Sequence, residues 1–260
     1  MNTSYPSMGT ITPSAHTAVV REIFTVSSAR YDFLNHFLSL RRDVGWRSCA
    51  VEQMRLDRAN GSGRLLDVAT GTGDLAIAAA LRYPGVTVTG IDFARPMLEI
   101  GKRKVRQLGL DGRIELLEGD ALSLPFPDAS FEVCSIAFGM RNIPDKRKAL
   151  REMARVTVPG GRVLILEMTF APTWAFRPWY GFYLNRIMPT MARIFVRHGA
   201  TYTYLADSIR HFPHPDRFDQ IMRESGFARV THHGLTFGSA FLHIGRTQGA
   251  GGHSIRQGAR

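Results

Sequence analysis

Two glycines and a set of acidic residues have the types and spacing that cofactor chemistry requires. Gly71 and Gly73 lie between an apolar run and a helical pattern, where glycine lets the backbone come close to a ligand. The free amides at the start of the helix can face that ligand. Asp92 ends the next apolar run, at the position where a carboxylate accepts the ribose hydroxyls of a nucleotide. This combination predicts a site for an adenosine-type cofactor.

The identity of that cofactor is open between a dinucleotide and S-adenosylmethionine (SAM). The run Gly71 to Ala76 also fits the dinucleotide pattern with alanine in third place. Two acidic positions favour SAM. Asp67 precedes the turn and could meet an amino group, and Asp120, followed by the small Ala121 and the apolar segment 124–126, offers an acceptor for an adenine amine. We therefore expect SAM, with an unliganded α/β turn as the structural alternative.

Strand and helix patterns alternate along most of the chain, which predicts a parallel, doubly wound α/β sheet. Ligands of such sheets bind beyond the carboxyl ends of the strands, where Asp92, Arg141 and Glu167 are expected. The predicted strands are residues 64–68, 86–91, 113–118, 131–137 and 162–168, with a closing pair at 226–233 and 237–245.

One domain accommodates the 260 residues. We predict a disordered N-terminus over residues 1–14, a single domain over 15–246 and a disordered tail over 247–260. Within the domain, residues 15–60 form an N-terminal helical lid, and residues 174–212 form a helical cap inserted after the fifth strand.

Composition restricts the setting and the partners. A hydrophobic content of 44% is ordinary for a globular protein, but a net charge of +11 favours contact with a polyanion, either nucleic acid or an anionic membrane. Two cysteines predict neither a disulfide framework nor a metal cluster. There is no signal-peptide pattern and no apolar run of about 20 residues. We expect a cytoplasmic protein, with peripheral contact at the inner face of the cell membrane left open.

Four stretches together resemble one family. The turn is similar to that of class I SAM-dependent methyltransferases, which have a Rossmann-like fold, with Ala69 in place of their first glycine. Over about residues 20–245 the chain resembles the UbiE family, the C-methyltransferases of ubiquinone and menaquinone biosynthesis. The stretches are 31–35 with Trp46, 137–145, 155–167 and 202–213. The resemblance implies methylation of demethylmenaquinol or of a benzoquinol precursor, and it implies that Thr72, Asp92, Asp120 and Ala121 hold SAM.

The resemblance also suggests catalytic roles. A quinol ring carbon becomes nucleophilic when a neighbouring hydroxyl loses its proton, so the phenolate must be stabilised and aimed at the methyl group. Arg141 is the expected cation, because arginine stays protonated, and Asn142 could bond the same ring. Tyr31 and Asp43 are candidates for proton transfer. The structural alternatives are an ion pair of Arg141 with Asp145 or Glu167, and a helix-capping role for Asp43.

Departures from the family lie on the substrate side, including Leu34, Asp43 and Thr169. They leave open a methyltransferase for another small aromatic metabolite. A nucleic-acid partner is not expected, because segment 138–141 lacks the Asn/Asp-Pro-Pro-aromatic run of amino-methylating enzymes.

Residues 174–197 combine aromatic residues with arginines. They are interpreted either as a roof over the acceptor or as an element at a membrane surface. Tail length of the acceptor and oligomeric state, a homodimer included, are left open.

Overall fold

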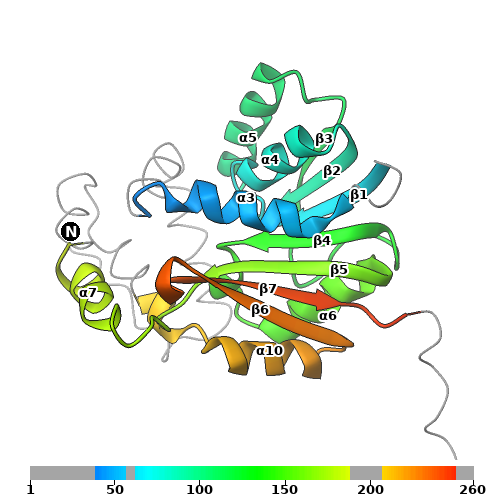
Figure 1. Cartoon of the computed structure of the whole chain (residues 1–260). Helices are drawn as coiled ribbons and strands as arrows, with labels where there is room; N and C mark the ends of the chain where they lie inside the picture. The colour runs from blue at the N-terminus through cyan, green and yellow to red at the C-terminus, as the bar shows by residue number, and fades with distance from the viewer. Residues whose placement is uncertain (1–38, 57–61, 188–206, 250–260) are drawn as a thin grey trace, which may run out of the picture.

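The computed structural model describes residues 39–56, 62–187 and 207–249. Its strands form one seven-stranded sheet in the order β3-β2-β1-β4-β5-β7-β6 (Figure 1). The strands are β1 (Ser62–Val68), β2 (Gly85–Asp92), β3 (Ile114–Glu118), β4 (Phe131–Ala137), β5 (Thr157–Met168), β6 (Arg229–Leu235) and β7 (Ala240–Arg246). Neighbours among β1 to β5 pair in parallel, whereas β7 runs antiparallel to β5 and to β6. The predicted mostly parallel, doubly wound sheet is confirmed.

Helices cover both faces of this sheet, and each face has its own apolar cluster. The helices are α3 (Arg42–Met54), α4 (Asp74–Arg82), α5 (Arg95–Gln107), α6 (Lys146–Val156), α7 (Arg177–Phe182) and α10 (Pro215–Glu224). Figure 1 shows α3, α4 and α5 in one part of the molecule and α6 and α10 in another. Side chains of the first three helices belong to one cluster, and those of the last two belong to the other. No helix in the described ranges combines the length and the apolar composition that crossing a bilayer requires.

The central strand explains where the site lies. Leu65, Leu66 and Val68 of β1 are buried, as expected for a strand covered on both faces. β1 pairs with β2 on one side and with β4 on the other. The chain therefore changes direction across the sheet at this point, and a ligand crevice is expected outside the carboxyl ends of these strands.

Several elements differ from the sequence-based prediction. β6 and β7 each begin three residues later than the predicted closing pair. β5 begins at Thr157, five positions before the predicted Arg162, because pairing with β4 continues past a register shift between Phe131 and Val133. The cap has a short α7 followed by a π-helical turn, η4 (Tyr183–Ile187). Residues 188–206 of the predicted cap and residues 15–38 of the predicted lid lie outside the described residues, so the predicted division into lid, domain and cap stays a prediction.

A buried carboxylate ties α10 to the antiparallel end of the sheet. Asp219 Oδ1 lies 2.7 Å from His243 Nδ1, and Asp219 Oδ2 lies 2.8 Å from His232 Nδ1. Burial alone would raise the pKa of Asp219, but hydrogen bonds from His243 and His232 hold it below its usual value. The carboxylate is thus an anion at neutral pH, and each imidazole donates an N–H to it.

Cys49 and Cys134 are both free thiols.

Candidate cofactor and acceptor site

The turn between β1 and α4 is built from left-handed backbone. Gly71 and Gly73 have φ of 58° and 80°, values that glycine adopts without steric cost. Ala69 has φ of 51°, although it carries a side chain. Thr70 N–H donates to Ile91 O at 3.0 Å, which fastens the turn to the end of β2. The predicted glycine turn therefore lies at the carboxyl ends of the two central strands, with the start of α4 behind it.

Asp92 lies where the sequence placed a ribose acceptor, at the carboxyl end of β2. Its Oδ2 accepts the Gly71 N–H at 2.8 Å, and its Oδ1 accepts the Ala94 N–H at 2.8 Å. Burial raises the pKa of Asp92, and backbone hydrogen bonds from Ala94, Gly71 and Phe93 partly offset the rise. A carboxylate has about four acceptor positions, so these bonds still leave capacity for a ribose hydroxyl. Asp92 thus orients the turn and faces the crevice at once.

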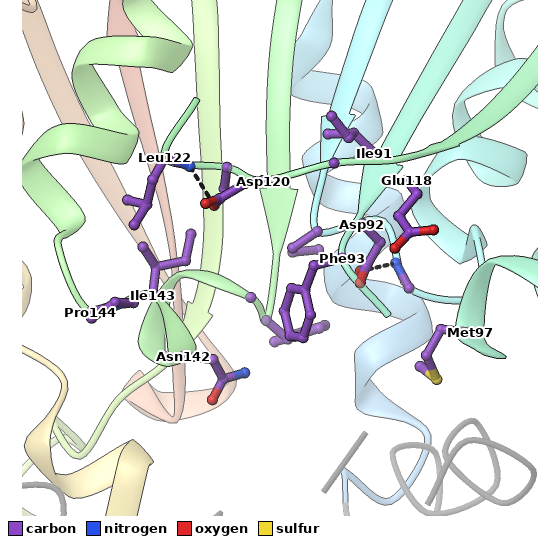
Figure 2. A pocket seen from close by; sticks show the side chains of 17 residues that line it. Ile91, Asp92, Phe93, Met97, Glu118, Asp120, Leu122, Asn142, Ile143 and Pro144 are labelled. Carbon is purple, nitrogen blue, oxygen red and sulfur yellow. Dashed lines mark hydrogen bonds between the residues drawn. The ribbon is translucent and has the colours of Figure 1, made fainter. Parts of the chain in front are cut away.

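A cavity of about 310 Å³ opens beside Asp92. Figure 2 shows Leu122, Ile143 and Pro144 on one side and Asp92 and Met97 on the other. A mainly apolar wall with a few polar groups is typical of pockets that bind a heterocyclic ligand.

The predicted Asp120 and Ala121 both line this cavity. Asp120 Oδ1 accepts the Leu122 N–H at 2.8 Å (Figure 2), which shapes the loop after β3. The sequence suggested an apolar lid from residues 124–126, but the apolar wall of the cavity comes from Leu122 and Ile143 instead. Leu124 is buried in the core and Phe126 packs edge-on against Phe131.

A second, smaller cavity of about 40 Å³ is lined by polar groups. It contains Asp67, which is 1% exposed and accepts hydrogen bonds from the hydroxyls of Thr70 at 2.7 Å and Ser135 at 2.9 Å. Burial raises the pKa of Asp67 to about 6, and the two hydroxyl bonds oppose that rise. Gly71 lines both cavities and Thr72 lines the second, whereas Gly73 begins α4 behind them. Above about pH 6, Asp67 therefore presents a negative charge to this cavity.

Arg141 and Asn142 follow β4 in a short 3₁₀ turn, η3 (Met140–Asn142). Arg141 is 4% exposed, and its Nη1 lies 2.5 Å from Glu167 Oε1. The backbone N–H of Arg141 donates to Glu167 Oε2 at 3.0 Å. Asn142, rather than Arg141, is on the wall of the larger cavity. The ion pair with Glu167, which the sequence offered as an alternative, is present, and it fixes the turn that carries Asn142 to the cavity.

The candidates from the lid are placed less directly. Tyr31 lies outside the described residues. Asp43 is in the first turn of α3, where it accepts hydrogen bonds from Ser39 Oγ and Arg47 Nη1, both at 2.5 Å. The N-cap residue of α3 is Arg41, whose side chain makes no capping bond, and Asp43 lies in the first turn that follows it. Asp43 itself lines neither cavity, but it contacts Arg47, which lines the second one.

Sequence reasoning missed several residues of this site. Arg47 and Phe138 line the second cavity, and Phe93 lines the first. Lys104 was not among the predicted site residues, yet its Nζ donates to Asp74 Oδ1 at 2.7 Å and to Thr72 Oγ1 at 3.0 Å. The position of Arg47, directly after Trp46 in the first family-like stretch, was the signal that could have identified it.

The chain matches known sequences over nearly its whole length. Residues 12–247 match the ubiE/COQ5 methyltransferase family. The chain is 44% identical to a demethylmenaquinone methyltransferase of Thermus thermophilus over 86% of this chain and 99% of that protein. It is 42% identical to a ubiquinone/menaquinone biosynthesis C-methyltransferase UbiE of Geotalea daltonii over 87% of this chain and 95% of that protein.

Solved structures share the fold at low identity. A SAM-dependent methyltransferase of Thermotoga maritima, described as a possible histamine N-methyltransferase, has a TM-score of 0.61 at 17% identity over 87% of this chain and 99% of that one. The [4+2]-cyclase SpnF has a TM-score of 0.65 at 17% identity over 96% and 100%. Because these names cover different reactions, the fold alone does not set the chemistry. The sequence match is more specific: this chain belongs to the ubiE/COQ5 methyltransferase family.

Proposed function

We propose that this chain is a SAM-dependent C-methyltransferase that converts a prenylated quinol, demethylmenaquinol, to its methylated product, menaquinol. The observation that carries the proposal is the similarity to the Thermus thermophilus demethylmenaquinone methyltransferase over almost the full length of both chains. The site is compatible with it, because a mainly apolar cavity and a charged one meet at the glycine turn.

The residues present fit SAM by their chemistry. Asp92 supplies a carboxylate for the ribose diol, and the larger cavity offers apolar surface for adenine next to Asp120. Asp67 supplies a buried anion for an ammonium group. When bound, SAM provides an electrophilic methyl group on a sulfonium. The part of this chain is to hold that group, exclude water from it and aim the acceptor carbon at it.

Arg141 and Asn142 are proposed to act on the acceptor. Methylation replaces a ring hydrogen, so the ring must carry phenolate charge while the new C–C bond forms. A guanidinium cannot accept a proton in the protein, and Arg141 therefore stabilises that charge electrostatically. Glu167 holds one guanidinium nitrogen and the backbone of the same residue, so the cation is fixed in direction. Asn142 reaches the cavity from the adjacent position.

Contacts of the cap support a position of Arg141 near the acceptor. Tyr180 of α7 is buried and its hydroxyl donates to Ser239 O at 3.3 Å. Burial and the neighbouring Tyr183 raise the pKa of Tyr180, while the charge of Arg141 partly offsets the rise. The inner face of α7 is therefore within electrostatic reach of Arg141. Burial also raises the pKa of Tyr183 to about 12, so both phenols stay neutral hydrogen-bonding groups at physiological pH.

The proposal is tested with purified protein, SAM and two acceptors, demethylmenaquinol and a benzoquinol precursor, with products identified by mass spectrometry. We expect methylation of the naphthoquinol. Asp92→Ala should weaken SAM binding by about 10- to 100-fold, since a charge-assisted hydrogen bond contributes roughly 1.5–3 kcal/mol. Asp111→Ala, an exposed carboxylate, is the matched control.

The outcomes separate the alternatives. Methylation of the benzoquinol alone would show that the acceptor is a benzoquinol and not a naphthoquinol. SAM binding without product from either quinol would favour another small aromatic acceptor. A chain that binds no SAM would contradict the whole proposal.

We also propose that the outer face of the cap meets an anionic membrane, in a cytoplasmic protein that associates peripherally. Trp174 and Trp179 are 89% and 71% exposed, and Phe182 is exposed beside them. Arg177 and Arg186 lie in the same segment. Exposed aromatic residues next to arginines are typical of interfacial elements, and a prenylated acceptor would be held in the bilayer.

Vesicle sedimentation tests this contact. Removing Arg177 and Arg186 together should weaken binding to phosphatidylglycerol vesicles by about 30-fold, at roughly 1 kcal/mol for each arginine near the surface. Activity on a short-chain soluble quinol should survive. Replacing Arg106 and Arg151, exposed arginines on α5 and α6, is the control. If the wild-type protein does not bind the vesicles, or if high salt leaves its binding unchanged, the membrane contact is contradicted. α7 then only covers the acceptor.

A further inference from the structure

The second cavity is joined to the first at the glycine turn. Ala69, Gly71, Ala137 and Phe138 line both. The two cavities differ in chemistry, since the first is mainly apolar and the second is lined by one guanidinium, two carboxylates and two threonine hydroxyls. A single ligand that occupies both therefore needs an apolar heterocycle at one end and a charged group at the other.

Arg47 is the cation of the second cavity, and its direction is fixed from three sides. Its Nη1 lies 2.5 Å from Asp43 Oδ2, and its Nη2 lies 3.6 Å from Asp74 Oδ2. The guanidinium carbon lies 5.4 Å from the centre of the Phe138 ring, within the range of a cation–π contact. A guanidinium has five N–H donors in a planar fork. The close bond to Asp43 uses part of that capacity, and Arg47 lies in the wall of the cavity.

The charges around this cavity suit an amino acid. Lys104 Nζ lies 2.7 Å from Asp74 Oδ1, so that carboxylate has a cation of its own. At neutral pH the net charge of the groups in and around this cavity is minus one. Three carboxylates, Asp43, Asp67 and Asp74, outweigh the two cations Arg47 and Lys104. The methionine end of SAM carries an ammonium, a sulfonium and a carboxylate, which sum to one net positive charge. Asp67 can face the ammonium, and the carboxylate then requires a cation.

We propose that Arg47 binds the α-carboxylate of SAM and that Asp43 is a positioning residue, which holds the guanidinium in the direction that this contact needs. The inference rests on SAM as the cofactor of the proposed function and extends it to a residue outside the glycine turn. It also gives α3 a role, because the helix that packs on α4 would bring the lid to the cofactor. The competing interpretation is that Arg47 only fastens α3 to α4 through Asp74.

A series of three ligands distinguishes these interpretations by calorimetry on the full chain. S-adenosylhomocysteine has both charged groups, S-adenosyl-3-thiopropylamine lacks only the carboxylate, and 5′-methylthioadenosine lacks the whole amino-acid end. In the wild type, loss of the carboxylate should weaken binding by about 10- to 100-fold, the size of one charge-assisted contact. In Arg47→Met, the affinities for S-adenosylhomocysteine and for the carboxylate-free analogue should differ by no more than about threefold. The affinity for 5′-methylthioadenosine should stay unchanged. Arg64→Met, which replaces an exposed arginine, is the control and should keep the preference.

Arg47→Met leaves the buried Asp43 carboxylate without its cation and could unfold the chain. The double variant Asp43→Asn/Arg47→Met removes that charge as well, and the wild-type ligand series needs no variant at all. A wild type that binds S-adenosylhomocysteine and the carboxylate-free analogue equally would overturn the inference and leave the proposed cofactor intact. A wild type that binds none of the three would overturn the cofactor itself.

The role of Asp43 is tested by kinetics. As a positioning residue, Asp43→Asn should raise the KM for SAM by about three- to tenfold and leave kcat within about twofold. A group that takes a proton from the acceptor would give the opposite result, a large fall in kcat with SAM affinity retained. That second pattern would return Asp43 to proton transfer and remove it from the carboxylate site.

Discussion

The two halves of the carboxyl edge of the sheet are stabilised in different ways. On the cofactor half, around β1 to β3, each carboxylate bonds a group close to it in sequence: Asp67 with Thr70, Asp92 with Ala94 and Asp120 with Leu122. Asp67 and Asp92 each accept one further bond from a more distant residue, Ser135 and Gly71. On the acceptor half, the bonds join distant segments. Arg141 pairs with Glu167 from the next strand, and Trp46 Nε1 donates to Thr236 Oγ1 across 190 positions.

The two halves therefore depend on different sets of elements. The cofactor half is built from one glycine turn and from the carboxyl ends of the neighbouring strands β2 and β3. The acceptor half depends on η3, β7 and α7 arriving together. Phe176 of the cap region packs on Tyr180 and Phe237 with ring centres 5.9 Å and 5.3 Å apart. Substitutions should therefore cost more stability on the acceptor half than on the cofactor half.

The largest expected effect follows from removing the charge of Glu167. Glu167→Gln leaves the Arg141 guanidinium buried without its counter-charge, and the free energy of unfolding should fall by about 3–5 kcal/mol. Urea denaturation measures it. Glu99→Gln removes an exposed partner of Lys102 and should cost less than about 1 kcal/mol. Equal effects of the two substitutions would show that the Arg141–Glu167 pair does not stabilise the acceptor half.

The next effect concerns rate. Arg141→Lys keeps the positive charge but loses the planar fork that Glu167 and an acceptor oxygen can share. We expect kcat to fall by about 10- to 100-fold while affinity for S-adenosylhomocysteine stays within about twofold. Steady-state kinetics with calorimetry provides both values, and Arg151→Lys on the exposed face of α6 is the control. Unchanged turnover would assign Arg141 to structure alone.

The backbone of the cofactor half, a strand, a glycine turn and a helix, was predicted from sequence because its information is local, whereas the binding roles of its residues stay predictions. Gly71, Gly73 and Asp92 are recognisable from strand and helix patterns on either side of them. The start of α6 is equally local: the side chain of its N-cap residue Asp145 accepts the Lys148 N–H, as a capping carboxylate does.

The rest depends on pairings that one sequence does not reveal. The partner of Arg141 stayed open between Asp145 and Glu167 because only the sheet register places Glu167 beside η3. Arg47 is an ordinary helix residue by sequence, and only the packing of α3 on α4 brings it to the second cavity. Lys104 of α5 does not line that cavity but bonds Thr72 and Asp74, which do. Tyr31 and most of the predicted lid lie outside the described residues, so their predicted roles remain predictions.

A smaller effect is expected on the cofactor half, from the charge of Asp67. Its pKa of about 6 exceeds the unfolded value near 3.9, so the folded chain binds a proton more tightly between these values. Stability should fall as pH rises from about 4 to 6 and stay level above. Asp67→Asn should therefore stabilise the unliganded protein at pH 8 by about 1–3 kcal/mol, and the gain should vanish near pH 4.

The same Asp67→Asn variant should bind SAM more weakly, because the ammonium group of SAM loses its anionic partner. Denaturation of the unliganded variant and calorimetry with S-adenosylhomocysteine, each at pH 4 to 8, measure both changes. A variant that is less stable than the wild type at pH 8 would indicate that the hydroxyl bonds of Thr70 and Ser135 outweigh the burial of the charge.

The smallest expected effect lies at the junction of the two halves, where Ala69 meets Gly139. A Cβ at position 139 would lie 2.7 Å from the Ala69 Cβ, so the methyl of one residue requires glycine at the other. Ala69 itself has a positive φ, a conformation that costs an L-residue about 1–2 kcal/mol, while glycine costs roughly 0.5–1 kcal/mol in chain entropy. Ala69→Gly should therefore change stability by less than about 1 kcal/mol.

A double-mutant cycle isolates the contact itself. Gly139→Ala should destabilise the wild type, but less so in the Ala69→Gly background, with a coupling of about 1 kcal/mol between the two sites. The nearby Ile136 side chain, 3.1 Å from the added Cβ, is present in both backgrounds and cancels in the cycle. Additive effects would show that Ile136, not Ala69, sets the requirement for glycine. A coupling of the expected sign would mean that the loop after β4 was shaped by the alanine that replaces the first glycine of the turn.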